Sequence, residues 1–138
     1  MKNIFKKTLS ICLAFTLVFA LFSVSTYAAT GSYTRPLPTL NIIGGRSMEV
    51  TVSAPSIPPG AVITNVTLTG SRSGTGIVTW QVKHNVGGLT SSLPYSTSGA
   101  STKAFNPLTP NTTWTIYVSS PTDYTTITNG QLKVEYSY

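Results

Sequence analysis

The chain has 138 residues, with nine Lys and Arg, three Asp and Glu, one His and one Cys, and a formal net charge of +6. A hydrophobic fraction of 41% with only 9% charged residues excludes a typical disordered chain, and the length fits a single domain. Three carboxylates leave little for acid–base catalysis or for a metal site, and no cofactor is expected.

Residues 1–28 have the layout of a secretory signal peptide. Three lysines within the first seven residues precede an apolar run over residues 11–22, and small residues precede a cleavage site after Ala28. The apolar run is shorter than the ~20 residues of a membrane-spanning helix, so no transmembrane segment is expected after cleavage. We expect a secreted, extracellular protein, with association to the cell surface as an option.

The predicted mature chain, residues 29–138, contains neither a thiol nor a disulfide. The only cysteine, Cys12, lies in the signal peptide, and a cysteine-free exported chain suggests a bacterial source. Removing the three lysines of the signal peptide lowers the net charge to +3, and the remaining Lys and Arg are scattered. Nucleic acid is therefore not an expected partner.

The mature chain reads as strands separated by turns. We expect residues 29–46 to form an extended N-terminal arm and a first strand, because Arg35-Pro36-Leu37-Pro38 disfavours a helix or a sheet interior. Residues 47–138 form the predicted β-sandwich domain. Period-two alternation of apolar and polar residues predicts strands over 40–43, 48–53, 62–69, 77–84, 102–106, 113–119 and 131–138.

Turn residues lie between these runs. Asn129-Gly130 predicts a hairpin just before the last strand, and residues 85–101, rich in Gly and Ser, predict a long loop. About seven to eight strands with one polar face each indicate an all-β fold. We expect an antiparallel two-sheet β-sandwich, jelly-roll-like or immunoglobulin-like.

Two segments resemble a known β-sandwich family. The aromatic-centred run 113–118, followed by Asn129-Gly130-Gln131-Leu132, resembles the end of the P domain of subtilisin-like proprotein convertases and bacterial secreted enzymes. The run Ile57-Pro58-Pro59-Gly60 resembles the opening of that domain. The Asp-Leu pair and the acid-lined calcium positions of the P domain have no counterpart here. The resemblance therefore implies a jelly-roll-like sandwich and no specific function.

Few residues suit catalysis. A Ser–His–Asp set would need His84 and Asp123, but no Gly-x-Ser-x-Gly elbow is present, and we interpret His84 as a surface or strand-end residue. Glu49 and Glu135 fall on the polar phase of their strands, where salt bridging is favoured over a glycosidase-like pair. We do not expect an enzyme.

Tyrosines are the candidate binding residues. Tyr95 lies in the predicted long loop and is the leading choice, and Tyr33, Tyr117 and Tyr124 lie in the arm, on a polar strand face and in a loop. The two tryptophans, Trp80 and Trp114, fall on apolar strand phases and are expected in the core.

These observations predict a secreted, non-enzymatic module that binds or coats a cell wall, a matrix polysaccharide or a surface protein. The alternative is a self-assembling fibre or matrix subunit that pairs through edge strands. In that alternative the arm at 29–43 completes a neighbour's sheet, although pairing within its own domain is favoured, and the last strand is able to pair as an edge.

Overall fold

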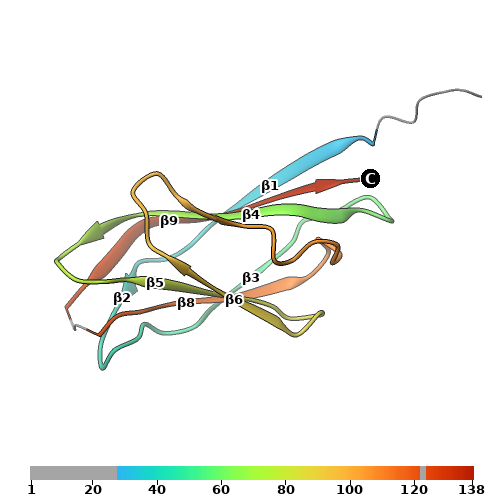
Figure 1. Cartoon of the computed structure of the whole chain (residues 1–138). Helices are drawn as coiled ribbons and strands as arrows, with labels where there is room; N and C mark the ends of the chain where they lie inside the picture. The colour runs from blue at the N-terminus through green and yellow to red at the C-terminus, as the bar shows by residue number, and fades with distance from the viewer. Residues whose placement is uncertain (1–27, 122–123) are drawn as a thin grey trace, which may run out of the picture.

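The computed structural model describes residues 28–121 and 124–138. Over these ranges the chain is all-β, with two antiparallel sheets stacked as a sandwich and no helix (Figure 1). The predicted β-sandwich is therefore confirmed, with nine strands in the described ranges. The signal peptide predicted for residues 1–28 lies outside the described residues except for Ala28.

Sheet A is built around the C-terminal strand. Its order is β1-β9-β4-β7, and the short β2 pairs with residues 126–127 of β9 on the edge that β1 shares farther along. The strands are β1 (Thr30–Pro36), β2 (Leu40–Asn41), β4 (Val62–Ser73), β7 (Ala100–Thr102) and β9 (Thr126–Ser137).

Sheet B faces sheet A and has the order β3-β8-β5-β6. Its central strands β8 and β5 pair along their length, which places Trp80 beside Val118 and His84 beside Trp114. The strands are β3 (Val50–Ser53), β5 (Thr79–His84), β6 (Leu89–Pro94) and β8 (Thr113–Ser119).

The core lies between the two sheets and follows the predicted alternation. Trp80 and Trp114 are fully buried, as expected from their apolar phase. Strand β4 departs from strict alternation because the register with β9 shifts between residues 63 and 65. The shift turns Ile63 into the core and leaves Val62 only half-buried.

The predicted arm belongs to the sandwich itself. Residues 30–36 pair with β9 throughout, and the backbones of Ala29 and Tyr138 exchange two hydrogen bonds of 2.8 Å. In this structure the segment completes its own sheet and not that of a neighbour. The last strand, which we expected to be able to pair as an edge, is interior, because β1 pairs along one side and β4 along the other.

Two further expectations are wrong in detail. Residues 85–101 are not one long loop, because they contain strand β6, paired with β5 from Thr79 to His84. Asn129-Gly130 does not form a hairpin turn. It lies inside β9, where Asn129 has a φ of 52° and the register with β4 shifts opposite Gly70. The dipeptide therefore makes a β-bulge, which uses the same left-handed backbone that a hairpin turn requires.

Candidate functional site

The four candidate tyrosines do not form one site, and Tyr33 is part of the core. Its side chain is 8% exposed. Its hydroxyl donates to Pro110 O at 3.1 Å and accepts from Trp114 Nε1 at 2.8 Å. Burial raises the pKa of Tyr33, while the Trp114 hydrogen bond acts in the opposite direction. Tyr33 therefore joins the two sheets and is not available to a ligand.

Tyr95, the leading candidate from the sequence, is held by hydrogen bonds between its hydroxyl and the backbone of Gly70 and Arg72 in β4. Its hydroxyl donates to Gly70 O at 2.9 Å and accepts from the Arg72 backbone N–H at 3.2 Å. The Arg72 guanidinium carbon lies 5.3 Å from the centre of the Tyr95 ring. The polar end and one side of the ring are thus occupied by the chain itself.

Tyr124, which is exposed, and Tyr117, which is half-buried, remain as candidates, and they differ in setting. Tyr124 is 94% exposed at the end of the sandwich, with a positive φ of 68°. Tyr117 is half-buried on the outer face of β8, directly opposite Gln81 of β5. The Arg46 guanidinium carbon lies 4.1 Å from the centre of the Tyr117 ring. Of the four tyrosines, Tyr117 alone is partly exposed on a paired strand, although Arg46 covers one face of its ring as Arg72 does for Tyr95.

His84 is buried, which corrects the expectation of a surface histidine. It packs edge-on to Trp114 at 5.1 Å between ring centres and lies 6.3 Å from the ring of Phe105. The Gly87 N–H donates to Nδ1 at 2.8 Å, so Nε2 carries the proton and donates to Thr109 O at 2.8 Å. Both ring nitrogens are hydrogen-bonded to the backbone, so the ring connects the end of β5 to the segments around Gly87 and Thr109. Asp123 lies outside the described residues.

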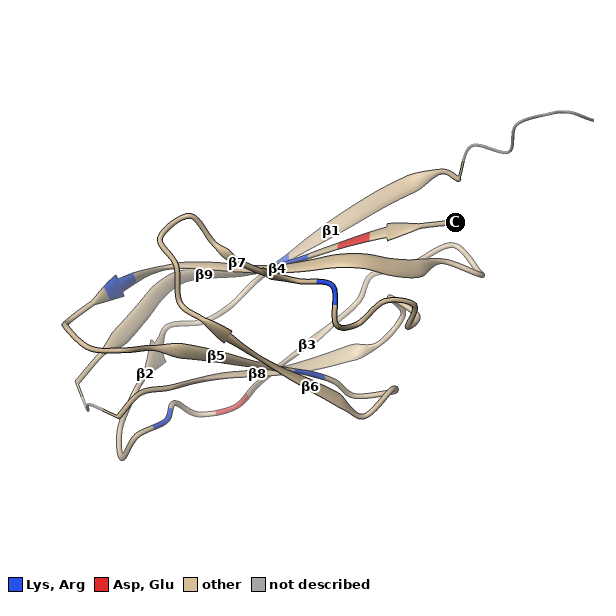
Figure 2. Ribbon diagram, viewed as in Figure 1, with Lys and Arg blue, Asp and Glu red and all other residues tan. Residues whose placement is uncertain are grey.

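The two glutamates do not form a catalytic pair. Glu49 binds Arg46 at 2.7 Å beside sheet B, and Glu135 binds Lys133 at 2.7 Å on sheet A, so the two carboxylates lie on opposite sides of the molecule (Figure 2). Hydrogen bonds from Lys133 and then Asn65 lower the pKa of Glu135. A carboxyl held in its ionised form is the opposite of what a general acid requires.

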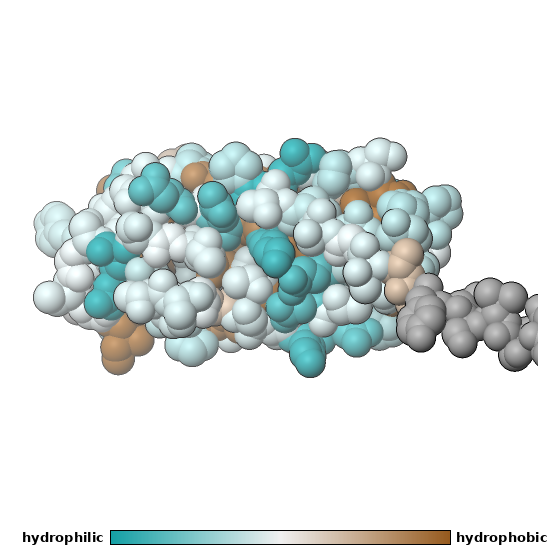
Figure 3. Space-filling model, turned by 90° about the horizontal axis from the view of Figure 1, so that it is seen from above, coloured by the Kyte–Doolittle hydropathy of each residue, from teal (hydrophilic) through white to brown (hydrophobic). Residues whose placement is uncertain are grey.

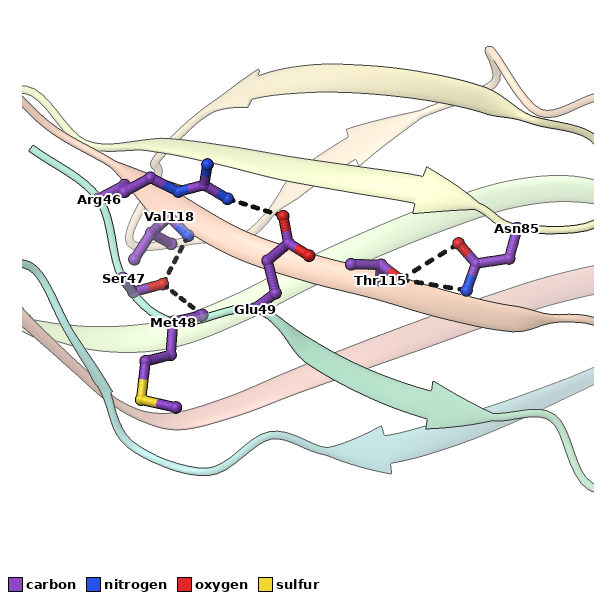
Figure 4. A network of polar contacts seen from close by, with 7 residues as sticks. All are labelled: Arg46, Ser47, Met48, Glu49, Asn85, Thr115 and Val118. Atoms are coloured by element: carbon purple, nitrogen blue, oxygen red, sulfur yellow. Dashed lines mark hydrogen bonds and ion pairs between the residues drawn. The ribbon is translucent and has the colours of Figure 1, made fainter.

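The outer face of sheet B is a polar ladder centred on Tyr117. The Ser92 hydroxyl donates to Gln81 Oε1 at 2.6 Å, and Asn85 Nδ2 donates to the hydroxyls of Thr113 and Thr115 at 2.9 and 3.1 Å. Figure 4 shows the Asn85–Thr115 contact and, nearer the β3 edge, the Arg46–Glu49 pair. We refer to this surface as the Tyr117 face; it comprises Tyr117, Gln81, Ser92, Asn85, Thr113, Thr115, Arg46 and Glu49.

The sequence located only part of this face. Alternation places Gln81, Thr115 and Tyr117 on the polar sides of their strands. It does not reveal that β5 and β8 are neighbours, and this pairing brings the three side chains together. Arg46 was missed because it lies between predicted strands, where it forms an isolated bridge with Ser119.

The outer face of sheet A is also polar and carries no tyrosine candidate. Viewed from above in Figure 3, it is mostly hydrophilic or neutral. Asn65 Nδ2 donates to Glu135 Oε2 at 2.9 Å, and the hydroxyls of Thr67 and Ser101 lie 2.8 Å apart. These contacts run across β9, β4 and β7 and tie the strands to one another.

An apolar groove opens along one side of the sandwich, between β2 and β3. Its volume is about 360 Å³. Ile43 and Met48 stand at its rim with exposed fractions of 80% and 84%. The lining residues are Pro38, Thr39, Leu40, Asn41, Ile43, Met48, Glu49 and Val50.

Within the described part of the chain, no three His, Cys, Asp or Glu residues come close enough together to hold a metal ion. The same residues contain no helix that is long and apolar enough to cross a membrane.

Comparison with known proteins gives a shared fold. No protein-family model and no curated protein matches the chain. The crystal structure of FLHE matches with a TM-score of 0.57 and 16% identity, over 80% of this chain and 100% of that chain. The crystal structure of the Aeromonas sobria serine protease and chaperone complex matches with a TM-score of 0.52 and 9% identity, over 78% of this chain and 27% of that chain.

The second match bears on the resemblance to the P domain. Part of a chain in a serine-protease complex has the fold seen here, so the resemblance holds at the level of a β-sandwich found in such a complex. At these identities the likeness concerns the fold alone.

Proposed function

We propose that this protein is a secreted, non-enzymatic β-sandwich module that binds a cell-wall or matrix polysaccharide through the Tyr117 face. The observation that carries the proposal is Tyr117, half-buried on a paired strand beside Gln81, with the Arg46 guanidinium over one face of its ring and the other face left for a ligand. Tyrosine offers an apolar ring for stacking together with a polar hydroxyl.

The chemistry around Tyr117 suits a polymer of hydroxyl groups. Amide and hydroxyl side chains both donate and accept hydrogen bonds, and here Gln81, Asn85 and Thr115 project from adjacent paired strands and the turn that follows β5. Because the side chains stand on a hydrogen-bonded sheet, they are held in place before a ligand arrives, which reduces the entropy lost on binding.

The surroundings of the titratable groups support a non-enzymatic module. His84 is enclosed by aromatic rings and backbone, and Glu49 and Glu135 lie on different sheets with a basic partner each. Secretion is proposed from the N-terminal pattern of the sequence alone.

The proposal is tested by retention on purified cell walls and insoluble polysaccharides. We expect the chain starting at Ala29 to be retained, and Tyr117→Ala to bind about 2- to 10-fold more weakly, the equivalent of about 0.5–1.5 kcal/mol for one aromatic contact. Tyr124→Ala, an exposed tyrosine away from the face, is the matched control. Thermal unfolding of each variant confirms that the fold is kept.

Two results would contradict the proposal. One is no retention on any wall or polysaccharide. The other is an equal loss of binding in Tyr117→Ala and Tyr124→Ala, which would place the contact elsewhere.

A protein partner is the second candidate, and the apolar groove between β2 and β3 favours it. Retention of the chain by a surface protein and not by polysaccharide, with Tyr117→Ala unaffected, would support this alternative. Self-assembly through edge strands is the remaining option, and the free edge of β3 beside the apolar groove supports it.

A further inference from the structure

Strand β3 is the edge of sheet B that borders the apolar groove. It pairs with β8 on one side, and no described strand pairs with its other side. Ala54 N–H donates to Thr112 O at 3.0 Å, so residues 50, 52 and 54 direct their backbone groups toward β8. Thr51 and Ser53 direct theirs outward, and the outward Ser53 O accepts a 2.8 Å hydrogen bond from Arg35 Nε.

The two faces of this edge differ in polarity. Glu49, Thr51 and Ser53 are exposed on the outer face. Val50 and Val52 face inward and are half-buried, and Met48 extends from the side opposite to Glu49 (Figure 4). A strand laid against β3 would cover Met48 and the rim of the groove, while its polar side chains would continue the outer face of sheet B.

Natural edge strands are protected by lysine, proline, a short length or a bulge, and the other edges here carry such features. Strand β1 ends in Arg35-Pro36, β6 ends in Pro94, and β7 has three residues followed by Lys103. Residues 47–54 contain neither a proline nor a lysine. Strand β3 has only four residues, but its free edge carries neither a proline nor a lysine and lies beside the exposed side chains of Ile43 and Met48.

We infer that two copies of this chain pair through β3, antiparallel and about a two-fold axis at Thr51. The outward backbone groups of the two Thr51 residues then exchange two hydrogen bonds. Val50 of one copy lies opposite Val52 of the other, and Met48 lies opposite Ala54, which gives a continuous apolar strip. The four-stranded sheet B of each copy becomes half of an eight-stranded sheet.

Charge is complementary in this register. Glu49, which pairs with Arg46 of its own copy, comes opposite Ser53 of the second copy; the Ser53 carbonyl accepts from the second copy's Arg35 and keeps one lone pair for the Glu49 N–H. Because the axis is two-fold, this arrangement occurs twice. A strand added in parallel, or displaced by two residues, would lose this match.

The symmetry fixes the size of the assembly. An isologous interface uses the same patch on both copies and closes on itself, so β3 pairing gives a dimer and not a fibre. This inference does not depend on the proposed polysaccharide binding, since it uses the edge of sheet B and needs no ligand, although Glu49 belongs to both surfaces.

The test is the solution mass of the chain starting at Ala29, measured by light scattering from micromolar to millimolar concentration. We expect the mass to rise to twice the monomer value and then to stay constant. Thr51→Lys and Thr51→Glu each place like charges side by side at the axis, so each variant alone should remain a monomer. An equal mixture of the two should recover the doubled mass, because the ammonium of one variant then meets the carboxylate of the other.

Ser32→Lys is the matched control. Ser32 is an exposed edge residue on β1 of the other sheet, and it lies opposite Glu135, which tolerates a lysine neighbour. We expect this variant to dimerise as the unaltered chain does. Thermal unfolding of every variant checks that the sandwich is intact.

Five results would overturn the inference. Three concern mass: a monomer at millimolar concentration, a mass that continues to rise beyond twice the monomer, and dimerisation of Thr51→Lys alone. The fourth is loss of the dimer in Ser32→Lys. The fifth is failure of the mixture to dimerise, which would place the axis away from Thr51.

Discussion

At the residue scale, Tyr33 and Trp114 form a polar connection through an apolar core. Tyr33 comes from β1 of sheet A and Trp114 from β8 of sheet B, and their hydrogen bond of 2.8 Å crosses between the sheets. The same hydroxyl reaches Pro110 O, so one side-chain atom satisfies an indole N–H and a backbone carbonyl. The sequence did not reveal this role, because a prolyl segment with a single tyrosine resembles an exposed arm.

Tyr33→Phe should destabilise the fold by about 1–3 kcal/mol, because the buried Trp114 Nε1 would lose its partner, while Pro110 O would keep only the Thr112 N–H. Urea unfolding at neutral pH measures the difference. The comparison variant is Tyr124→Phe, whose hydroxyl is at an exposed site and whose free energy of unfolding should match that of the unaltered chain. Equal stability of Tyr33→Phe would show that the hydroxyl contributes nothing.

The raised pKa of Tyr33 adds a pH dependence to this difference. Above about pH 10 the tyrosine ionises in the unfolded chain while the folded chain retains its proton. The unfolded state is thereby favoured, so stability is lost as pH rises above that value. The difference in free energy of unfolding between the unaltered chain and Tyr33→Phe should therefore become smaller in alkaline solution.

Glu135→Gln should change how the stability of the fold depends on pH at the acid end of the range. The lowered pKa of Glu135 means that its contribution to stability is complete above about pH 4.3 and declines as pH falls, because the unfolded carboxyl takes up a proton first. The variant should lack this acid-side decline. Unfolding curves measured from acid to neutral pH test it, and parallel curves for the two proteins would refute it.

At the element scale, β9 illustrates what alternation predicts and what it does not. Leu132 and Val134 are buried and Lys133 is exposed, as the pattern requires. The strand nevertheless begins at Thr126, before the Asn-Gly dipeptide that indicates a turn. Local sequence specifies the left-handed residue at 129, but only the pairing with β4 decides whether the chain reverses there or continues.

Strand β6 was missed for a related reason. As an edge strand it has one deeply buried residue, Leu93, among Thr and Ser residues. A strand that packs one side chain into the core leaves little periodicity to detect. By contrast, β8 buries Trp114, Ile116 and Val118, and its predicted bounds agree with the structure.

The bulge in β9 depends on the small residue across from it. A Cβ atom at Gly70 would lie 2.7 Å from Ile127 Cγ2. Gly70→Ala should therefore cost about 1–3 kcal/mol, since the crowded core must shift. Gly60→Ala does not serve as a control because of its positive φ, whereas Ser71→Ala, next along the exposed end of β4, does. Urea unfolding compares the two, and equal stabilities would contradict the close approach.

At the scale of the whole molecule, the candidate site is also predicted only in part by local sequence, and the rest depends on strand pairing. The sequence predicted a β-sandwich and a tyrosine as the binding residue. The hydroxyl of its leading choice, Tyr95, is hydrogen-bonded to the backbone of β4. The Tyr117 face comes from strand pairing between segments far apart in the chain, such as those that carry Asn85 and Thr115. Strand order is a property of the assembled fold, so no local pattern contains it.

The two hydrogen bonds between the backbones of Ala29 and Tyr138 hold these residues side by side, although they are far apart in the sequence. A circular permutant that joins residue 138 to residue 29 by a short linker, and opens between the exposed residues Thr97 and Ser98, should keep both sheets. We expect a thermal midpoint within a few degrees of the original, measured by circular dichroism. Opening the chain inside β9, between residues 131 and 132, should abolish cooperative unfolding.

If the permutant folds, the order in which the strands leave the ribosome is not what builds the sandwich. Strand β1 must otherwise wait for β9, the last strand to be made, before it has a partner. In the permutant the two strands are neighbours in sequence, and sheet A can begin from a local hairpin. The permuted chain should therefore refold faster than the original, because the pairing of β1 with β9 no longer closes the longest loop in the molecule.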